Sequence, residues 1–256
     1  MSPEPEFDHV APVYDETRRP PSEGELDILV RLLDGCHTLV DGGVGTGRFA
    51  VPLRARGFEV VGVDLSLAMM RRAAGKGIAR LVRANLQHLP LRDDAVDAAF
   101  TAHVLQLVPD PTVVLRELGR VARHNVVVLL PERPSSSPSD ARGEFYRRYR
   151  AIAKELGYSL PERGPRYWHR FEELRAIASP LEVVVVEGQP PALTEEAFRR
   201  QRDPTSWFGE RAVPKEIHAE ILRRIEAERP TESERLRVPR VERFIVWSSS
   251  ELRRPK

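Results

Sequence analysis

A glycine-rich turn that follows an acidic residue is the part of this sequence best suited to bind a ligand. An apolar run ends at Asp41, and residues 42–47 then supply four glycines before a segment with helical spacing, residues 49–56. Glycines let the backbone come close to a ligand and adopt unusual dihedral angles. The helix that follows offers its free N–H groups to the same ligand. This layout is typical of a nucleotide-type pocket at the carboxyl end of a parallel strand.

A second carboxylate follows at the spacing expected for a ribose ligand. Residues 60–64 form a buried-strand pattern that ends at Asp64, about 20 residues after the glycine turn, where an acid would meet ribose hydroxyls. Each charge-assisted hydrogen bond of this kind contributes about 1.5–3 kcal/mol when it is shielded from water. The two motifs together predict an adenosine-like ligand.

Two classes of adenosine ligand compete for this turn. Residues 45–50 fit the dinucleotide pattern G-x-G-x-x-A, which would suit a nicotinamide dehydrogenase. A pyrophosphate, however, would be repelled by Asp41 at the mouth of the turn. A ligand with a cationic amino acid tail would be attracted instead, and S-adenosylmethionine carries both an ammonium and a sulfonium. The sequence therefore favours S-adenosylmethionine over a dinucleotide.

Two further motifs complete a resemblance to a known family. In the first, a strand pattern ends at Asn85 and is followed by a Leu-Pro turn and by a second strand pattern that begins with aspartates, residues 93–100. In the second, at the N-terminus, residues 7–18 read F-D-x-x-A-x-x-Y-D-x-x-R. In this order the four motifs resemble the class I S-adenosylmethionine-dependent methyltransferases, especially the methyltransferase type 11 or UbiE-like family. The resemblance covers about residues 5–130 and two late strands.

The resemblance implies a set of cofactor-binding residues. Asn85 takes the adenine-edge position, where many relatives have aspartate, with Leu86 beside the ring, while Tyr14 and Arg18 lie near the amino acid end. The full set is Tyr14, Arg18, Asp41, Gly42, Gly43, Gly45, Thr46, Asp64, Leu65, Met69, Asn85, Leu86 and Thr101. Asp41 could alternatively cap the following helix, Asn85 could form a turn, and Met69 could belong to the core.

The sequence indicates the residues that would contact the methyl acceptor less clearly than those for the cofactor. His103 follows the fourth strand, close to where the methyl group should project, and an imidazole could orient or deprotonate an acceptor there. A polar residue at the start of a loop or helix is the competing interpretation. Aromatic residues between 146 and 168, together with Trp207 and Phe208, could line an acceptor cavity or pack between a cover and the sheet.

Alternating strand and helix patterns predict an α/β fold with a parallel sheet. A capping box at Ser22 starts the first regular helix, Pro52 falls near the start of another, and a loop is expected over 131–138. Strands are expected at 38–41, 60–64, 79–83, 97–101, 125–130, 181–187 and 241–248, and further helices at 66–74, 110–123, 141–156, 171–178 and within 194–229.

The resemblance implies a Rossmann-like seven-stranded sheet, mostly parallel, with the last strand antiparallel between strands five and six. Residues 1–35 would then cover the cofactor, while 36–130 and 180–250 would form the core. Helical insertions at 131–179 and 190–235 would cover the substrate side.

Composition narrows the class of protein. The 256 residues carry 40 basic and 38 acidic side chains, which gives a net charge of +2. We therefore do not expect an overall positive potential strong enough to attract nucleic acids. A single cysteine, Cys36, excludes an internal disulfide and a cysteine-based zinc site, and no metal is expected. No apolar run approaches the length of a membrane span, and no signal peptide is evident, so we expect a cytoplasmic protein, monomeric or homodimeric.

These observations lead to one leading hypothesis and two alternatives. The leading hypothesis is transfer of a methyl group from S-adenosylmethionine to a small molecule by in-line displacement, which leaves S-adenosylhomocysteine; alignment alone can contribute about 7–11 kcal/mol. A tRNA or RNA methyltransferase of the same fold would use the basic helix 141–156. A protein that binds the cofactor without catalysis is the third possibility.

Overall fold

The computed structural model describes residues 7–8, 10–18, 20–132, 141–160, 171–188, 213–227 and 240–254. Tyr167, Trp168, Trp207 and Phe208, expected near an acceptor, lie outside these ranges, and so do the side chains of residues 141–147. The predicted loop over 133–138 and the first helical segment of 194–229 also lie outside them.

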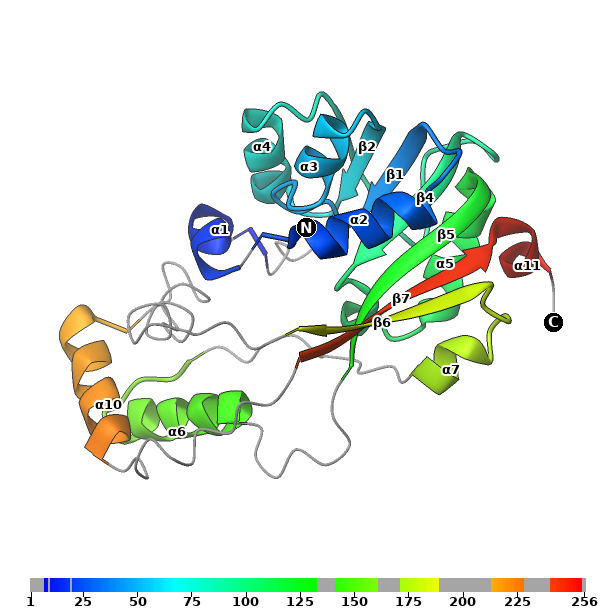
Figure 1. Cartoon of the computed structure of the whole chain (residues 1–256). Helices are drawn as coiled ribbons and strands as arrows, with labels where there is room; N and C mark the ends of the chain where they lie inside the picture. The colour runs from blue at the N-terminus through cyan, green and yellow to red at the C-terminus, as the bar shows by residue number, and fades with distance from the viewer. Residues whose placement is uncertain are drawn as a thin grey trace.

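The described strands form one seven-stranded sheet in the order β3-β2-β1-β4-β5-β7-β6 (Figure 1). β1 to β5 pair in parallel, whereas β7 runs antiparallel to both β5 and β6. This confirms the predicted fold class, including the position of the last strand. The strands are β1 (Thr38–Gly42), β2 (Glu59–Asp64), β3 (Arg80–Arg83), β4 (Val96–Ala102), β5 (Ala122–Glu132), β6 (Glu182–Gly188) and β7 (Arg240–Ser248).

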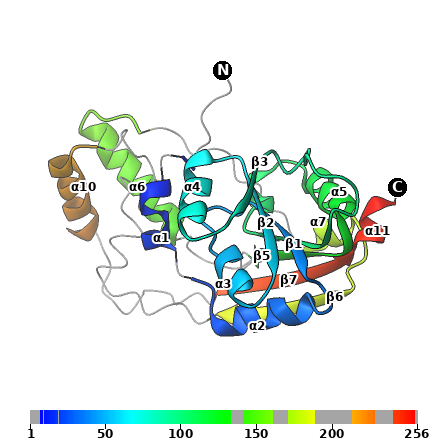
Figure 2. The same cartoon turned by 90° about the horizontal axis from the view of Figure 1, so that it is seen from above.

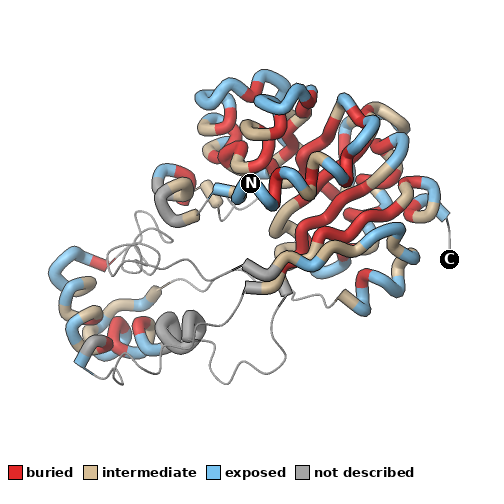
Figure 3. Tube along the Cα trace, viewed as in Figure 1, coloured by how far each residue is buried: buried red, intermediate tan, exposed pale blue. Residues whose placement is uncertain are grey.

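Helices cover both faces of the sheet, whose strands are largely buried (Figure 3), and two apolar clusters hold the helices there. One cluster joins α2 (Glu23–Leu32), α3 (Ala50–Ala55) and α4 (Leu67–Gly75) to the face that carries Phe100 and Phe244. The other joins α5 (Pro111–Val121), α7 (Phe171–Arg175) and α11 (Ser249–Arg253) to the face that carries Trp247. The edge where β1, β2 and β4 end is thereby fixed from two sides.

Local sequence signals set several helix ends as expected. The Ser22 hydroxyl accepts a hydrogen bond from the Glu25 N–H, and the Glu25 carboxylate accepts one from the Ser22 N–H, 2.6 Å away. This is the predicted capping box. Pro52 is the third residue of the short helix α3, where the missing N–H has no intrahelical partner to lose.

The strand β5 corrects the sequence prediction at both ends. The helix α5 ends at Val121 rather than near Arg123, and β5 begins at once with Ala122. Pro131, expected in a loop, remains in the strand opposite Glu242 of β7. The pairing of β5 with β4 has already ended at Leu129, so Pro131 has a paired strand on one side only. Proline is tolerated at such an edge position because no ladder N–H is required there.

Two helices form a separate packed unit. α6 (Ala141–Glu155) and α10 (Lys215–Ala227) share a cluster that includes Tyr149, Ile152 and Ile221, and the Tyr149 hydroxyl lies 2.7 Å from His218 Nδ1. Figure 1 draws this pair apart from α2, α3 and α4, and Figure 2 shows it on the side of the sheet opposite the C-terminus. α7 is shorter than the predicted helix 171–178, because its helical residues end at Arg175.

Candidate functional site

Asp41 is a buried carboxylate at the carboxyl end of β1. Its residue is only 4% exposed, and it lies in register between Gly62 of β2 and Phe100 of β4. Burial, reinforced by the charge of Asp64, raises the pKa of Asp41 to about 7, although a backbone hydrogen bond from Ala50 opposes the shift. A charge at this point therefore lacks the solvation that water would give it.

Asp64 ends β2 beside this group and is held by backbone donors. Its two carboxylate oxygens accept hydrogen bonds from the N–H groups of Gly45 and Ser66, each 2.8 Å long. Burial raises the pKa of Asp64, and the hydrogen bonds from Ser66 and Gly45 partly offset this effect. The structure thus brings the two acids predicted from the sequence to one edge of the sheet.

The glycine turn requires glycine for two different reasons. Gly43 has a φ of +78°, and a Cβ there would lie 2.2 Å from Val104 Cγ2, so this residue allows the turn to pack against the segment after β4. Gly45 has a φ of +54°, and a Cβ there would meet nothing closer than Gly43 O at 3.9 Å. The side of the turn at Gly45 is therefore open to a ligand.

Thr101 and Leu86 have packing roles in this structure. The Thr101 hydroxyl donates a 2.7 Å hydrogen bond to the carbonyl of Gly42 and is fully buried. Leu86 is 7% exposed, and its side chain packs against Gly42 from the α5 side. Both residues support the backbone on which the glycine turn stands, and a direct contact of either with a cofactor remains a prediction.

The N-terminal segment is attached to the site by two aspartates that the sequence reasoning did not select. Asp8 accepts hydrogen bonds from the Ser66 hydroxyl and from the N–H of Ala68, 3.3 Å away. Asp15 accepts a 2.6 Å bond from the Thr46 hydroxyl and lies 2.7 Å from Lys76 Nζ. Both aspartates belong to the N-terminal motif and could have been proposed as anchors from it.

Other residues of that segment form a small cluster of their own. Tyr14 packs edge-on to Phe7, with ring centroids 6.4 Å apart, and the Arg18 guanidinium lies 5.2 Å from the Tyr14 ring. Met69 is 2% exposed and packs with Val10 rather than on an open surface. The segment includes the short helices η1 (Ala11–Val13) and α1 (Tyr14–Thr17).

The turn after β3 carries the predicted adenine-edge residues. Asn85 is exposed, and its side-chain oxygen accepts a 3.0 Å hydrogen bond from the N–H of Gln87. Its amide nitrogen donates to Gln87 Oε1 at 3.2 Å. Asn85 therefore forms a local turn, as the competing interpretation proposed. Leu65, next to Asp64, is 52% exposed and accessible to a ligand.

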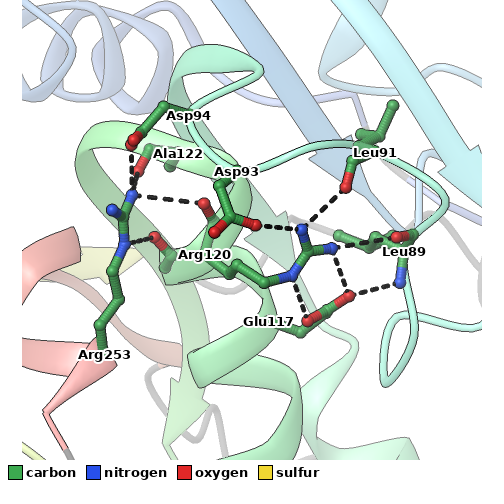
Figure 4. Close-up of polar contacts among 9 residues, drawn as sticks. Leu89, Leu91, Asp93, Asp94, Glu117, Arg120, Ala122 and Arg253 are labelled. Carbon is green, nitrogen blue, oxygen red and sulfur yellow. Dashed lines mark hydrogen bonds and ion pairs between the residues drawn. The ribbon is translucent and has the colours of Figure 1, made fainter.

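Two arginines make polar contacts with the residues that follow this turn, between Leu89 and Asp94, and with α5 (Figure 4). Arg120 of α5 donates to the carbonyls of Leu89 and Leu91 and pairs with Asp93 at 2.7 Å. Arg253 of α11 donates to the Gly119 carbonyl at 2.7 Å. Arg120 therefore ties the segment from Leu89 to Asp93, which follows the turn at Asn85, to α5.

His103 lies just after β4 and has a partner that the sequence reasoning missed. Its Nε2 is 3.5 Å from Oε1 of Glu242, and the two side chains are 16% and 3% exposed. The alternation of β7 places Glu242 on the same face as the buried Phe244. A carboxylate on the face of a strand that otherwise carries apolar residues is a signal in the sequence that could have identified Glu242. Val104, the next residue, touches Gly43, so this pair lies near the glycine turn.

Metal-binding clusters and membrane-spanning helices are both absent from the described part of the chain. Among them, no three histidines, cysteines, aspartates or glutamates gather closely enough to hold a metal ion. No helix within the described ranges has the length and apolar character needed to cross a membrane.

A family match and two curated relatives each cover part of this chain. A family model described as a methyltransferase domain matches residues 40–130. The ubiquinone/menaquinone biosynthesis C-methyltransferase UbiE of Syntrophotalea carbinolica is 37% identical over 133 residues, which are 46% of this chain and 56% of that protein. The malonyl-[acyl-carrier protein] O-methyltransferase of Hamiltonella defensa is 37% identical over 92 residues, 36% of each chain. The match therefore spans about half of these relatives' length or less.

Solved structures share the fold over most of the chain. A Thermotoga maritima S-adenosylmethionine-dependent methyltransferase superposes with a TM-score of 0.56 at 20% identity, covering 95% of this chain and 98% of the other. Phosphoethanolamine N-methyltransferase 2 of Haemonchus contortus, solved with S-adenosylmethionine, gives a TM-score of 0.58 at 14% identity and covers 94% and 56%. At these identities the likeness establishes the architecture of the sheet and its helices.

Proposed function

We propose that this chain, whose residues 40–130 match the model of a methyltransferase domain, is a class I S-adenosylmethionine-dependent methyltransferase and transfers a methyl group from that cofactor to a small-molecule acceptor. The observation that carries the proposal is the buried Asp41, whose pKa is raised to about 7 by burial and by the neighbouring Asp64. A buried acid of this kind is stabilised by a bound cation.

The residues at this edge fit the cofactor. Asp41 suits the ammonium of the amino acid tail, and Asp64, presented by backbone donors at the end of β2, suits the ribose hydroxyls. The open side of Gly45 leaves room for close approach, and the exposed Leu65 and Asn85 suit the adenine. A pyrophosphate would instead place negative charge against two carboxylates.

When bound, S-adenosylmethionine supplies a methyl group that the sulfonium has already activated. The protein then has two tasks, which are alignment of the acceptor atom and exclusion of water. The pinned N-terminal segment suits the second task, because Asp8 and Asp15 hold it against the start of α4 and the glycine turn. We assign the cover on the substrate side to α6 and α10, described helices of the two insertions, which share an apolar cluster separate from the two clusters that cover the sheet.

The relatives support a small organic acceptor group, either free or attached to a carrier protein. By their names, one acts in quinone biosynthesis as a C-methyltransferase and another methylates malonyl groups on acyl-carrier protein. The nearly balanced net charge of +2 also favours a small molecule over RNA.

The direct test is mass spectrometry of ligands that copurify with the protein, followed by an acceptor screen. The screen measures release of S-adenosylhomocysteine with quinols, phenols, carboxylates and amines. Recovery of S-adenosylmethionine or its product, together with turnover of one acceptor class, supports the proposal. Binding of NADH with no binding of S-adenosylmethionine would contradict it.

A further inference from the structure

Backbone N–H groups from two different loops orient the Asp64 carboxylate. The N–H of Gly45, in the glycine turn after β1, donates to Oδ2, and the N–H of Ser66, in the loop after β2, donates to Oδ1. A carboxylate accepts about four hydrogen bonds, so Asp64 keeps room for the hydroxyls of a ligand. The direction in which it presents the remaining lone pairs depends on where the two loops hold their N–H groups.

The loop after β2 is tied to the N-terminal segment by Asp8. Ser66 is buried, and its hydroxyl donates to Oδ1 of Asp8 while it accepts a 3.1 Å hydrogen bond from the N–H of Met69. A serine hydroxyl has a single proton, so the bond to Asp8 also directs the lone pair that caps α4. The same oxygen of Asp8 accepts a hydrogen bond from the N–H of Ala68 at 3.3 Å. Ser66 thus forms a bridge between Asp8, which holds its hydroxyl, and Asp64, which is held by its N–H.

The glycine turn is tied to the same segment by Asp15. Thr46 is buried, and its hydroxyl donates to Oδ1 of Asp15 at 2.6 Å. Gly45 directly precedes Thr46, and its φ of +54° lies in a region where a glycine backbone is unusually free to move. The bond of Thr46 to Asp15 therefore restrains the peptide whose N–H holds Asp64. Asp15 is itself fixed at the end of α4, because its Oδ2 lies 2.7 Å from Lys76 Nζ.

The segment between the two aspartates is packed on α4. Val10 and Ala11 are buried and form an apolar cluster with Met69. Asp8 and Asp15 lie on either side of this contact in the sequence, and they reach the start of α4 and the glycine turn, respectively. The segment therefore spans the two loops that donate to Asp64, and it cannot leave its place without releasing both bridges.

We propose that Asp8 and Asp15 are positioning residues for Asp64, because their bonds to Ser66 and Thr46 hold the N–H groups that orient this carboxylate. The inference rests on the proposed function, in which Asp64 binds the ribose hydroxyls of the cofactor. It gives the N-terminal segment a part in ribose recognition in addition to the exclusion of water. Residues that lock a binding side chain in its productive geometry raise affinity without touching the ligand.

The two aspartates differ in their electrostatic effect on Asp64. Burial raises the pKa of Asp64, the N–H groups of Ser66 and Gly45 oppose this rise, and the charge of Asp8 adds to it. Removal of Asp8 therefore changes both the charge near Asp64 and the hydrogen bond to Ser66. Asp15 is paired with a lysine and meets the turn through a threonine hydroxyl, so Asp15→Ala is the sharper test of positioning.

The first experiment reads the two donors in the free protein and needs no ligand. Hydrogen exchange of the Gly45 and Ser66 amides is followed by NMR of the full chain in wild type, Asp15→Ala and Asp8→Ala. Asp27→Ala, at an exposed acid of α2, is the matched control and should exchange as wild type does. Loss of a bridge should speed exchange about tenfold, at Gly45 in Asp15→Ala and at Ser66 in Asp8→Ala. A wild-type rate at one amide removes the aspartate assigned to it from the proposal, and wild-type rates at both overturn the inference.

The second experiment is a double-mutant cycle with S-adenosylhomocysteine, measured by calorimetry. We expect Asp15→Ala to raise the dissociation constant about five- to tenfold. In an Asp64→Asn background the same substitution should raise it less than about twofold, because the charged group that Asp15 positions is then absent. A segment that only covers the ligand would give the same factor in both backgrounds, and that result refutes the positioning role.

The outcomes separate this inference from the proposed function. Wild-type protein that does not bind S-adenosylhomocysteine refutes the proposed function itself. Binding by the wild type, with an unchanged dissociation constant in a folded Asp15→Ala protein, refutes only the positioning role. If Asp64→Asn binds too weakly for the cycle to be measured, the exchange rates of Gly45 and Ser66 decide, since they need no ligand.

Discussion

Asp41 and Asp64 lie at the ends of adjacent parallel strands, and burial together with the charge of Asp64 raises the pKa of Asp41 to about 7. The fold therefore holds a carboxylate pair whose ionisation is unfavourable without a nearby cation. Such a pair is a cost to stability in the free protein and an advantage in binding a positively charged ligand.

The cost to stability predicts a pH dependence. Because the pKa of Asp41 is higher in the folded state than in the unfolded chain, the folded state holds an extra proton between about pH 4 and pH 7. The free energy of unfolding should fall as pH rises through this window, by up to about 4 kcal/mol. Asp41→Asn should remove this loss, so it should be more stable than wild type at pH 8 and similar at pH 4. Urea unfolding of the free protein at several pH values measures this, and a difference that does not vary with pH would exclude Asp41 as its source.

The contact between the glycine turn and Val104 predicts a steric effect with a partial rescue. Gly43→Ala places a methyl group 2.2 Å from Val104 Cγ2 and forces alanine into a left-handed backbone. We expect a loss of about 1–3 kcal/mol in the free energy of unfolding. Val104→Ala should recover the steric part only. Thermal unfolding of both single variants and the double variant measures the coupling, and strict additivity would contradict the contact.

The hydrogen bonds of Asp15 predict how the N-terminal segment is held. Burial opposes the ionisation of Asp15, but the bonds from Lys76 and Thr46 outweigh it and lower the pKa of this carboxyl. Asp15→Asn should loosen residues 7–18 without unfolding the sheet, and faster hydrogen exchange of that segment should report it. Glu23→Gln, at an exposed acid at the start of α2, is the control. Equal exchange in the two variants would show that Asp15 does not hold the segment.

The arginine contacts of Figure 4 predict a local effect on the adenine-edge turn. Arg120→Met removes donors to the carbonyls of Leu89 and Leu91 and leaves Glu117 without this ion pair. We expect a loss of about 2–4 kcal/mol in the free energy of unfolding, because the arginine bridges several partners. Arg254→Met, at an exposed pair with Glu251, should change stability by less than about 0.5 kcal/mol. Similar losses in both variants would contradict the special role of Arg120.

Much of the fold could be predicted from local sequence. Alternating apolar strands and capped helices identified β1 to β4 and the helices between them, since each of these elements carries its own periodic signal. The boundaries of β5 could not be predicted in this way. Pro131 stays in the strand because β7 pairs with it, and β7 lies more than 100 residues later in the chain.

In the candidate site, too, the residues predicted correctly are those with local sequence signals, and the residues missed depend on distant parts of the chain. Asp41, Asp64 and the glycine turn were found because their roles depend on neighbouring residues in sequence. Asp8 and Glu242 were missed because their partners, Ser66 and His103, are brought to them only by the folded chain. Contacts between residues so far apart in sequence can rarely be predicted from local spacing, although the position of Glu242 on the buried face of its strand was an indication.

The binding of S-adenosylmethionine by the carboxylate pair is the central claim, and calorimetry of this cofactor against Asp64→Asn tests it most directly. Glu59→Gln, at the exposed opposite end of the same strand, is the matched control. We expect wild type and control to bind alike, and Asp64→Asn to bind about 10- to 100-fold more weakly, because two charge-assisted hydrogen bonds are weakened. Unchanged affinity in a folded Asp64→Asn protein would contradict the account.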